Sequence, residues 1–240
     1  MQHRPKLFYT TDPSPCPYLP DRMERKILTV LSRPSAPALY DRLSQAGFRR
    51  SHSLIYAPAC ANCQACIPIR IPARLFKISR GQKRVWKHYD RHIQAIICPP
   101  FATTEQFSLF QRYQNIRHAN GDMADMFWDE YKALIENTPI HTIIIEFRLK
   151  GDDTLICVSL VDVMEDGLSA VYTFYDPENP SKSWGTYSIL WLIEQTIHMQ
   201  KSYLYLGYYV PGSQKMAYKT NFQPAEIFRN GHWLEYQTAV

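Results

Sequence analysis

Short runs of branched apolar residues alternate with prolines and cysteines over residues 1–100. These runs predict strands over residues 23–31, 54–56 and 67–71. Pro68 and Pro72 fall within or next to the third run. Because proline has no N–H to donate to a neighbouring strand, the third strand is expected at an edge of its sheet.

Apolar residues that recur at helical spacing predict the helices. They are expected over residues 36–46, 82–97, 104–119, 124–137 and 186–201. Gly47 closes the first helix, and the prolines after Cys98 end the second. The second helix has a basic outer face, which is made by Lys83, Arg84, Lys87 and Arg91.

The pattern changes near residue 140, where branched and aromatic residues become frequent. Strands are expected over residues 140–149, 154–164, 168–175 and 203–208. Asp166-Gly167 marks a hairpin turn between the second and the third of these strands. Gly207 interrupts the last strand, which is typical of a β-bulge or of a backbone that contacts a ligand.

The order of these elements predicts an α+β fold in which an antiparallel sheet is flanked by helices. It is analogous to the GCN5-related acyltransferase fold, where a long hairpin precedes the helix that faces the donor. We therefore expect an acyltransferase-like domain over residues 101–240. A smaller amino-terminal region, rich in cysteine and arginine, is expected over residues 1–100.

The composition is that of a folded protein. The chain has 240 residues, of which 45% are hydrophobic and 20% charged, so it can form a substantial core and is not of the disordered class. No apolar run approaches the ~20 residues that span a bilayer, and no targeting signal follows Met1. We expect a cytoplasmic protein with no membrane partner and with reduced cysteines.

The net charge of +5 is unevenly distributed. Lys and Arg far outnumber Asp and Glu over residues 1–91, whereas acidic residues are in excess over residues 92–240. This asymmetry and the interleaved aromatic residues indicate a phosphate-rich partner such as RNA. The alternative is a set of solvated surface charges. The candidate RNA-binding residues are Arg22, Arg25, Arg50, Arg80, Lys83 and Arg84.

Cysteines form a dense cluster in the basic region. Cys60, Cys63 and Cys66 are separated by two residues each, and Cys16 precedes them. Together these thiols would suit zinc or an iron–sulfur cluster. However, the spacing is denser than in a structural zinc knuckle, and a second Cys-x-x-Cys pair is missing. Free cysteine is also a common small buried residue, so a packed segment that presents the surrounding arginines is the alternative.

Two further stretches carry candidate chemistry. Trp184-Gly185-Thr186 stands near a helix start, where free amides suit an anionic or carbonyl oxygen, although the same residues would serve an ordinary loop. Lys215 and Lys219 suit an anion, or form the polar face of a surface helix. No Ser-His-Asp set, carboxylate pair or phosphate-binding glycine loop stands out.

Ordered motifs along nearly the whole chain resemble the bacterial branch of the arginyl-tRNA–protein transferase family. They are Cys16-Pro-Tyr-Leu-Pro20, Gly47-Phe-Arg-Arg-Ser51, Cys60-x-x-Cys63-x-Ala-Cys66-x-Pro-x-Arg70, Tyr113-x-x-x-Arg117-His118, Ser169–Pro177, Gly185-Thr-Tyr-Ser-Ile-Leu190 and Lys215-Met-x-Tyr-Lys219. Two positions depart from the family pattern. Leu19 stands where eukaryotic members have a second cysteine, and Trp184 stands where an aliphatic residue is expected.

The resemblance implies transfer of leucine from leucyl-tRNA to proteins that begin with Asp or Glu, which marks them for degradation. Arginine as the donated residue is an alternative, because the same family scaffold transfers either. A tRNA-binding protein of this fold without transferase activity is another. An acyl-CoA-dependent N-acyltransferase is disfavoured, because the chain lacks an Arg/Gln-x-x-Gly-x-Gly/Ala pyrophosphate loop.

The implied reaction joins an α-amine to an activated ester, so positioning supplies much of the rate and no metal is required. Asp176 is the candidate to orient the amine, and Gly185, Thr186 or Tyr172 the candidates to stabilise the oxyanion. Cations are needed for the acceptor's acidic side chain. The candidate substrate-binding residues are Arg49, Arg70, Tyr175, Trp184, Tyr208, Tyr209, Lys215, Tyr218 and Lys219. The RNA-binding candidates named above would then contact tRNA.

Overall fold

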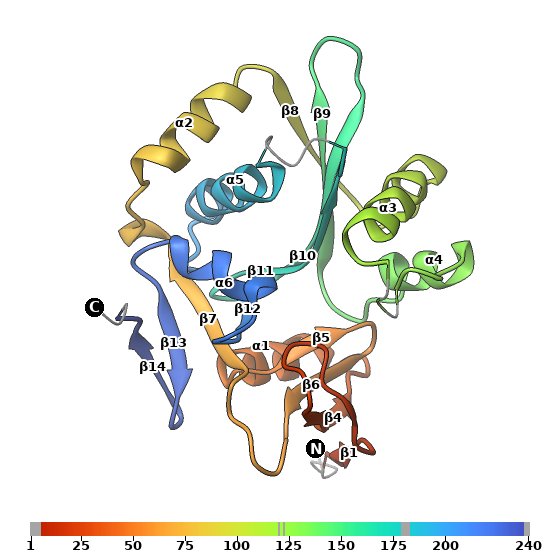
Figure 1. The fold of residues 1–240 in the computed structure, drawn as a ribbon, viewed down its shortest axis with the longest axis vertical. Helices are drawn as coiled ribbons and strands as arrows, with labels where there is room; N and C mark the ends of the chain where they lie inside the picture. The colour runs from red at the N-terminus through yellow and green to blue at the C-terminus, as the bar shows by residue number, and fades with distance from the viewer. Residues whose placement is uncertain (1–5, 120, 122, 179–182, 238–240) are drawn as a thin grey trace.

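An eight-stranded sheet organises the chain, in the order β14-β13-β7-β12-β11-β10-β9-β8 (Figure 1). The computed structural model describes residues 6–119, 121, 123–178 and 183–237. The strands are β7 (Ile67–Pro72), β8 (Ile93–Cys98), β9 (Thr142–Leu149), β10 (Leu155–Val163), β11 (Gly167–Tyr175), β12 (Tyr203–Tyr209), β13 (Glu226–Arg229) and β14 (His232–Glu235). Neighbours are antiparallel except β11 and β12, which are parallel.

A smaller sheet lies at the bottom of Figure 1, with the order β1-β4-β6-β5. Its strands are β1 (Tyr9–Thr10), β4 (Lys26–Val30), β5 (Arg49–Ser51) and β6 (Leu54–Pro58). Two more strands, β2 (Ser14–Pro15) and β3 (Met23–Glu24), pair with each other. Helix α1 (Ala36–Gln45) shares an apolar core with this sheet, and Tyr205 of β12 belongs to the same core.

A buried ion pair joins the small sheet to the large one. Arg50 of β5 donates through Nε and Nη2 to the carboxylate of Asp162 on β10, both at 2.7 Å. Tyr40 and Thr142 donate hydroxyl hydrogen bonds to the same carboxylate. Because both charges are paired and hydrogen-bonded, the desolvation cost of burying them is offset.

The helices cover both faces of the large sheet (Figure 1). Helices α2 (Arg80–Tyr89) and α5 (Trp184–His198) share the larger core with β7 and β12. Helices α3 (Thr104–Arg117) and α4 (Trp128–Glu136) lie on the other side. Short helices η1 (Ala73–Leu75), α6 (Gln214–Ala217) and η3 (Tyr218–Asn221) complete the set. No helix in these described ranges is long and apolar enough to cross a bilayer.

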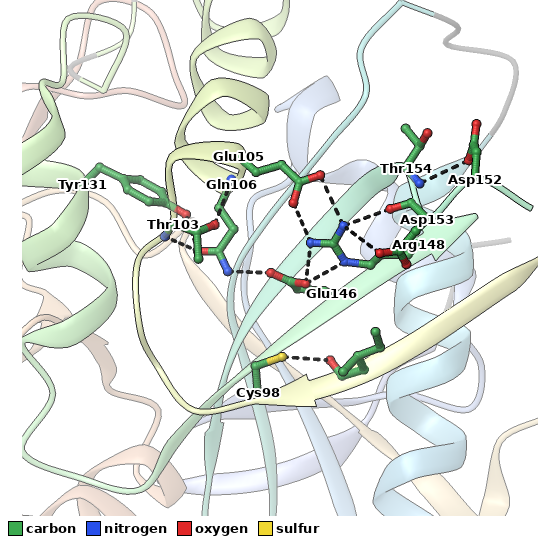
Figure 2. A network of polar contacts seen from close by, with 11 residues as sticks. Cys98, Thr103, Glu105, Gln106, Tyr131, Glu146, Arg148, Asp152, Asp153 and Thr154 are labelled. Carbon is green, nitrogen blue, oxygen red and sulfur yellow. Dashed lines mark hydrogen bonds and ion pairs between the residues drawn. The ribbon is translucent and has the colours of Figure 1, made fainter. Parts of the chain in front are cut away.

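A polar network anchors α3 on β9 (Figure 2). The Gln106 side chain closes a capping box with Thr103 and donates to the buried carboxylate of Glu146 at 2.7 Å. Arg148 pairs with both Glu146 and Glu105. These contacts hold the start of α3 on the sheet, so the position of its last turn is set by a rigid element.

The α+β class and the antiparallel sheet flanked by helices are confirmed. The hairpin of β10 and β11, the following helix α5 and strand β12 occur in the order on which the acyltransferase analogy was based. The division at residue 100 stays a prediction. Strands from both sides of it, β7 and β8 as well as β9–β12, belong to the same sheet.

Several predicted elements were wrong in part. The helix expected over residues 82–97 ends at Tyr89, and Ile93–Cys98 form a strand that pairs with β9. The periodicity of a short apolar run does not distinguish a helix from a strand. Here residues 93–98 form a strand because they pair with β9. The helix expected over residues 124–137 begins only at Trp128.

Strand β7 is internal rather than at an edge, since it lies between β12 and β13. Strand β13 pairs only with Ile69 and Arg70 of β7. Pro68 and Pro72 flank these two positions, so neither proline blocks the pairing with β13.

Candidate active site

Strands β11 and β12 part after a short parallel ladder. Their pairing ends at Ser169 and Tyr205. Gly207 follows with a positive φ of 82° and a shift of register against β7, which confirms the predicted bulge. We call residues 170–175 of β11 and 206–209 of β12 the strand fork. Beyond the last pair, the backbone groups of β11 that face β12 need another partner.

Arg49 supplies that partner. Its Nη2 donates to the carbonyl of Ala170 at 2.8 Å and to that of Val171 at 3.4 Å, and its Nη1 donates to Oγ of Ser169 at 3.1 Å. A Cβ at Gly207 would lie 2.9 Å from Cζ of Arg49. The guanidinium therefore occupies the base of the strand fork, and only glycine at position 207 leaves room for it.

Arg70 does not lie free to bind an acceptor carboxylate, contrary to the prediction. Its Nε donates to Glu226 at 2.7 Å and its Nη1 to Tyr205 at 3.0 Å. The guanidinium also packs over the rings of Tyr203 and Trp233, at 3.5 and 4.2 Å from their centroids. Both its charge and its π-face are thus engaged within the fold.

Lys219 lies on the β12 side of the fork, and its side chain is buried. Its Nζ donates to the carbonyl of Tyr208 at 2.7 Å. Burial, and secondly the charge of Arg49, lower the pKa of Lys219 to about 7. The Tyr208 hydroxyl in turn donates to backbone carbonyls of Gly47 and Tyr56. Lys219 is therefore partly neutral near pH 7, which makes it a poor permanent cation for an acidic substrate.

Tyrosines form the β11 side of the fork. The hydroxyl of Tyr172 accepts a hydrogen bond from Nε2 of Gln114 at 2.6 Å, and burial raises the pKa of Tyr172 to about 12. Tyr175 packs edge-on against Tyr113, with ring centroids 4.9 Å apart. A Cβ at Gly185 would lie 3.4 Å from the Tyr175 ring, so the start of α5 adjoins this wall.

Other predicted residues are brought to the edges of this site. Asp176 follows Tyr175 and is partly buried; its carboxylate accepts from the backbone N–H of Glu178 at 3.4 Å. The amide of Thr186 donates to the carbonyl of Ser183 within the helix start, so it does not face a substrate. Tyr209 pairs with Tyr236 at 5.7 Å between centroids, on the outer part of β12.

Trp184 is not in a substrate pocket as predicted. Its side chain is buried in the core between α2 and α5, with its ring 4.3 Å from that of Tyr89. The helix begins at Trp184 itself, two residues before the predicted start, and this turns the indole inward.

Arg50 is also misassigned as an RNA contact, because its side chain is buried on Asp162. The remaining basic candidates are exposed: Arg22, Arg25, Arg80, Lys83 and Arg84. They fall in two places, since α2 lies at the upper left of Figure 1 and β4, which follows Arg25, at the bottom.

The candidate cysteines line one cavity of about 750 Å³ beside the small sheet, together with Tyr18 and Leu19. Burial, followed by the neighbouring thiols of Cys16, Cys60 and Cys63, raises the pKa of Cys66 to about 12. In the part of the chain that the structure describes, no group of three or more His, Cys, Asp or Glu side chains is arranged to hold a metal ion. The described residues therefore do not support the zinc or iron–sulfur site that the sequence suggested.

Three residues at the end of α3 were missed as site residues. Arg117 donates to the hydroxyl of Tyr175 at 3.5 Å, and His118 contacts the hydroxyl of Tyr113 at 3.4 Å. Gln114 supports Tyr172. The signal was present in the Tyr113-x-x-x-Arg117-His118 motif, but helical periodicity alone assigns these positions to a surface.

Comparison with protein families identifies the class. Residues 14–84 match the family model described as Arginine-tRNA-protein transferase, N terminus, and residues 105–229 match the C-terminus model of the same family. The chain belongs to the arginine-tRNA-protein transferase family.

The names of similar curated proteins are more specific than the family description. The chain is 60% identical to the aspartate/glutamate leucyltransferase of Gluconobacter oxydans, over 97% of this chain and 96% of that protein. It is 54% identical to the protein of the same name from Gluconacetobacter diazotrophicus, over 96% and 88%. Among solved structures, L-PGS from Bacillus licheniformis matches 79% of this chain and 56% of its own at a TM-score of 0.48 and 12% identity, a likeness too loose to transfer any chemistry.

Replacing Arg49 with alanine is expected to lower the free energy of unfolding by about 1–3 kcal/mol, because the carbonyls at the strand fork lose their donors. Arg49→Lys should recover only part of this, since an ammonium does not reproduce the planar fork of donors. Urea unfolding measures both. The matched control is Arg42→Ala on α1, which is exposed and should stay within about 0.5 kcal/mol of the parent. Equal stability of Arg49→Ala and Arg42→Ala would contradict the assignment.

The lowered pKa of Lys219 predicts a pH dependence of stability. Between about 7 and the ordinary 10.5, the unfolded chain binds more protons at this lysine than the folded chain does. Its contribution therefore makes the protein more stable as the pH rises through this window. Lys219→Met should have a smaller gain between about pH 7 and about pH 9 in urea unfolding. Lys132→Met, at an exposed position on α4, should keep the parental gain, and a parental gain in Lys219→Met would refute the shift.

Proposed function

We propose that the protein transfers leucine from leucyl-tRNA to the α-amine of proteins that begin with Asp or Glu, which marks them for degradation. The observation that carries this is the 60% identity, over 97% of the chain, to a protein named aspartate/glutamate leucyltransferase. The same names favour leucine over arginine as the donated residue. Since charged tRNA is a cytoplasmic molecule, we place the reaction in the cytoplasm.

The aminoacyl ester would lie at the strand fork. Arg49 occupies the base of the fork, and Tyr175, at the end of β11, lies against the start of α5. The ester is already activated, so holding it and the amine in contact supplies much of the rate. Asp176, at the end of β11, is the residue proposed to orient the amine.

The oxyanion needs hydrogen-bond donors that keep their protons. The raised pKa of Tyr172 keeps its hydroxyl protonated at neutral pH, and the Gln114 amide fixes its oxygen. The amide of Gly185, in the first turn of α5, is the second proposed donor.

The acceptor's acidic side chain needs a lasting positive charge. Arginine side chains stay protonated in proteins, and Arg49 lies at the base of the fork. Burial lowers the pKa of Lys219 to about 7. We therefore assign Arg49 to the carboxylate. Lys219, whose Nζ donates to the carbonyl of Tyr208, supports β12 beside it. Arg22, Arg25, Arg80, Lys83 and Arg84 are the proposed contacts to the body of the tRNA.

The defining experiment mixes purified protein with leucyl-tRNA or arginyl-tRNA and with peptides that begin with Asp, Glu, Lys or Ala. Mass spectrometry should detect leucine on the Asp and Glu peptides only, and only with leucyl-tRNA. Arg112→Ala, an exposed change on α3, is the control that should retain activity. Arginine addition would reassign the donor. Binding of tRNA without any product would favour a tRNA-binding protein without transferase activity.

We further propose that no metal or cluster is required, because no step of the transfer needs one. Zinc or an iron–sulfur cluster at Cys16, Cys60, Cys63 and Cys66 is the competing hypothesis. Anaerobically purified protein is expected to be metal-free by elemental analysis, to have no visible absorption, and to transfer leucine at the same rate after chelator treatment. A stoichiometric metal whose removal abolishes transfer would refute this.

A further inference from the structure

The end of α3 and the short helices after β12 meet around Tyr175. Arg117 donates to its hydroxyl at 3.5 Å. His118 lies on the neighbouring Tyr113, and both Lys215 and Arg117 lie close enough to lower the pKa of His118, after the larger effect of burial. Tyr218 interacts electrostatically with Tyr175 and with Arg49. We call Arg117, His118, Lys215 and Tyr218 the cation–tyrosine patch.

The patch offers charge and an aromatic face to solvent. Arg117 and Lys215 are exposed, and neither takes part in an ion pair within the described ranges. Tyr218 is 47% exposed, so part of its ring is open to solvent. Exposed cations beside an exposed aromatic ring are the features with which proteins hold single-stranded nucleic acid.

The cation–tyrosine patch adjoins the strand fork at Tyr175. Tyr175 ends β11 and lies against Gly185 at the start of α5. Tyr218 connects the patch to Arg49, whose guanidinium occupies the base of the fork. The patch therefore lies at the outer end of the fork, on the side away from the ion pair of Arg50 and Asp162.

We propose that the cation–tyrosine patch binds the 3′-terminal nucleotide of the aminoacyl-tRNA. Arg117 and Lys215 pair with its phosphate, the Tyr218 ring stacks on its base, and His118 donates or accepts a hydrogen bond. The inference rests on the proposed function, and it assigns Lys215 and Tyr218 to the donor RNA rather than to the acceptor protein.

The chemistry of the donor favours this assignment over the acceptor's carboxylate. The leucyl ester is attached to the last nucleotide, so an ester in the fork places that nucleotide just outside it. A nucleotide needs both a cationic and a stacking partner, and the patch has both, whereas a carboxylate needs only the cation. Arg49 already supplies a cation deeper in the fork.

The test uses two donors, leucyl-tRNA and the trinucleotide CCA that carries leucine as an ester. In Arg117→Ala, Lys215→Ala and Tyr218→Ala, KM for the trinucleotide ester should rise about tenfold or more, with kcat within about threefold of the parent. Tyr218→Phe keeps the ring and should retain the parental KM. Arg112→Ala, also exposed on α3, is the matched control without an effect.

Unchanged KM for the trinucleotide ester in the patch variants would overturn the proposal. A rise confined to KM for the Asp peptide would also overturn it and assign the patch to the acceptor. If the parent protein transfers no leucine, the proposed function fails separately. Titration of uncharged CCA by calorimetry then still tests the patch, since binding must weaken in Arg117→Ala and not in Arg112→Ala.

Discussion

The hydrogen bonds from Arg49 to the β11 carbonyls are the contact on which the site depends. Two parallel strands that part leave backbone acceptors without a partner, and burial of such groups is costly. Arg49 satisfies them at 2.8 and 3.4 Å and keeps the strands apart. Its size is accommodated because position 207 is glycine. The Arg49 guanidinium thus replaces the hydrogen-bond donors that a neighbouring strand would supply. The candidate site residues lie where the two strands separate.

Arg50, the next residue in the chain, joins the two sheets instead of holding the strand fork. Successive residues of a strand point to opposite sides, so Arg49 and Arg50 of β5 leave the backbone in different directions. Arg50 ends on Asp162 of β10, in a pair that excludes water. Arg50 therefore joins the small sheet to the large one, and Arg49 extends from the same strand to the fork. A shift of the small sheet would displace both at once.

These roles limit what the sequence can predict. The hairpin, the bulge at Gly207 and helix α3 are local features, and they were predicted from residues close together in the chain. Arg50 and Arg70 appeared as surface cations because their partners, Asp162 and Glu226, are distant in sequence. The strand Ile93–Cys98 was mistaken for helix because its pairing with β9 is equally non-local. Arginines that pair with carboxylates inside the fold, such as Arg50 and Arg70, must be left out when a surplus of basic residues is used to infer a nucleic-acid partner.

The charges that remain have a consequence for the reaction. A protein α-amine has an ordinary pKa of ~7.7–8.0 and attacks only when neutral. Nearby positive charges lower the pKa of an ammonium, because they disfavour the charged form. Arg49, Arg117 and Lys215 are cations next to the strand fork. Burial, and secondly the charge of Arg49, lower the pKa of Lys219 to about 7. The same cations attract a phosphate backbone. In the proposed reaction, one positive field would favour both the binding of the donor and the reactive form of the acceptor.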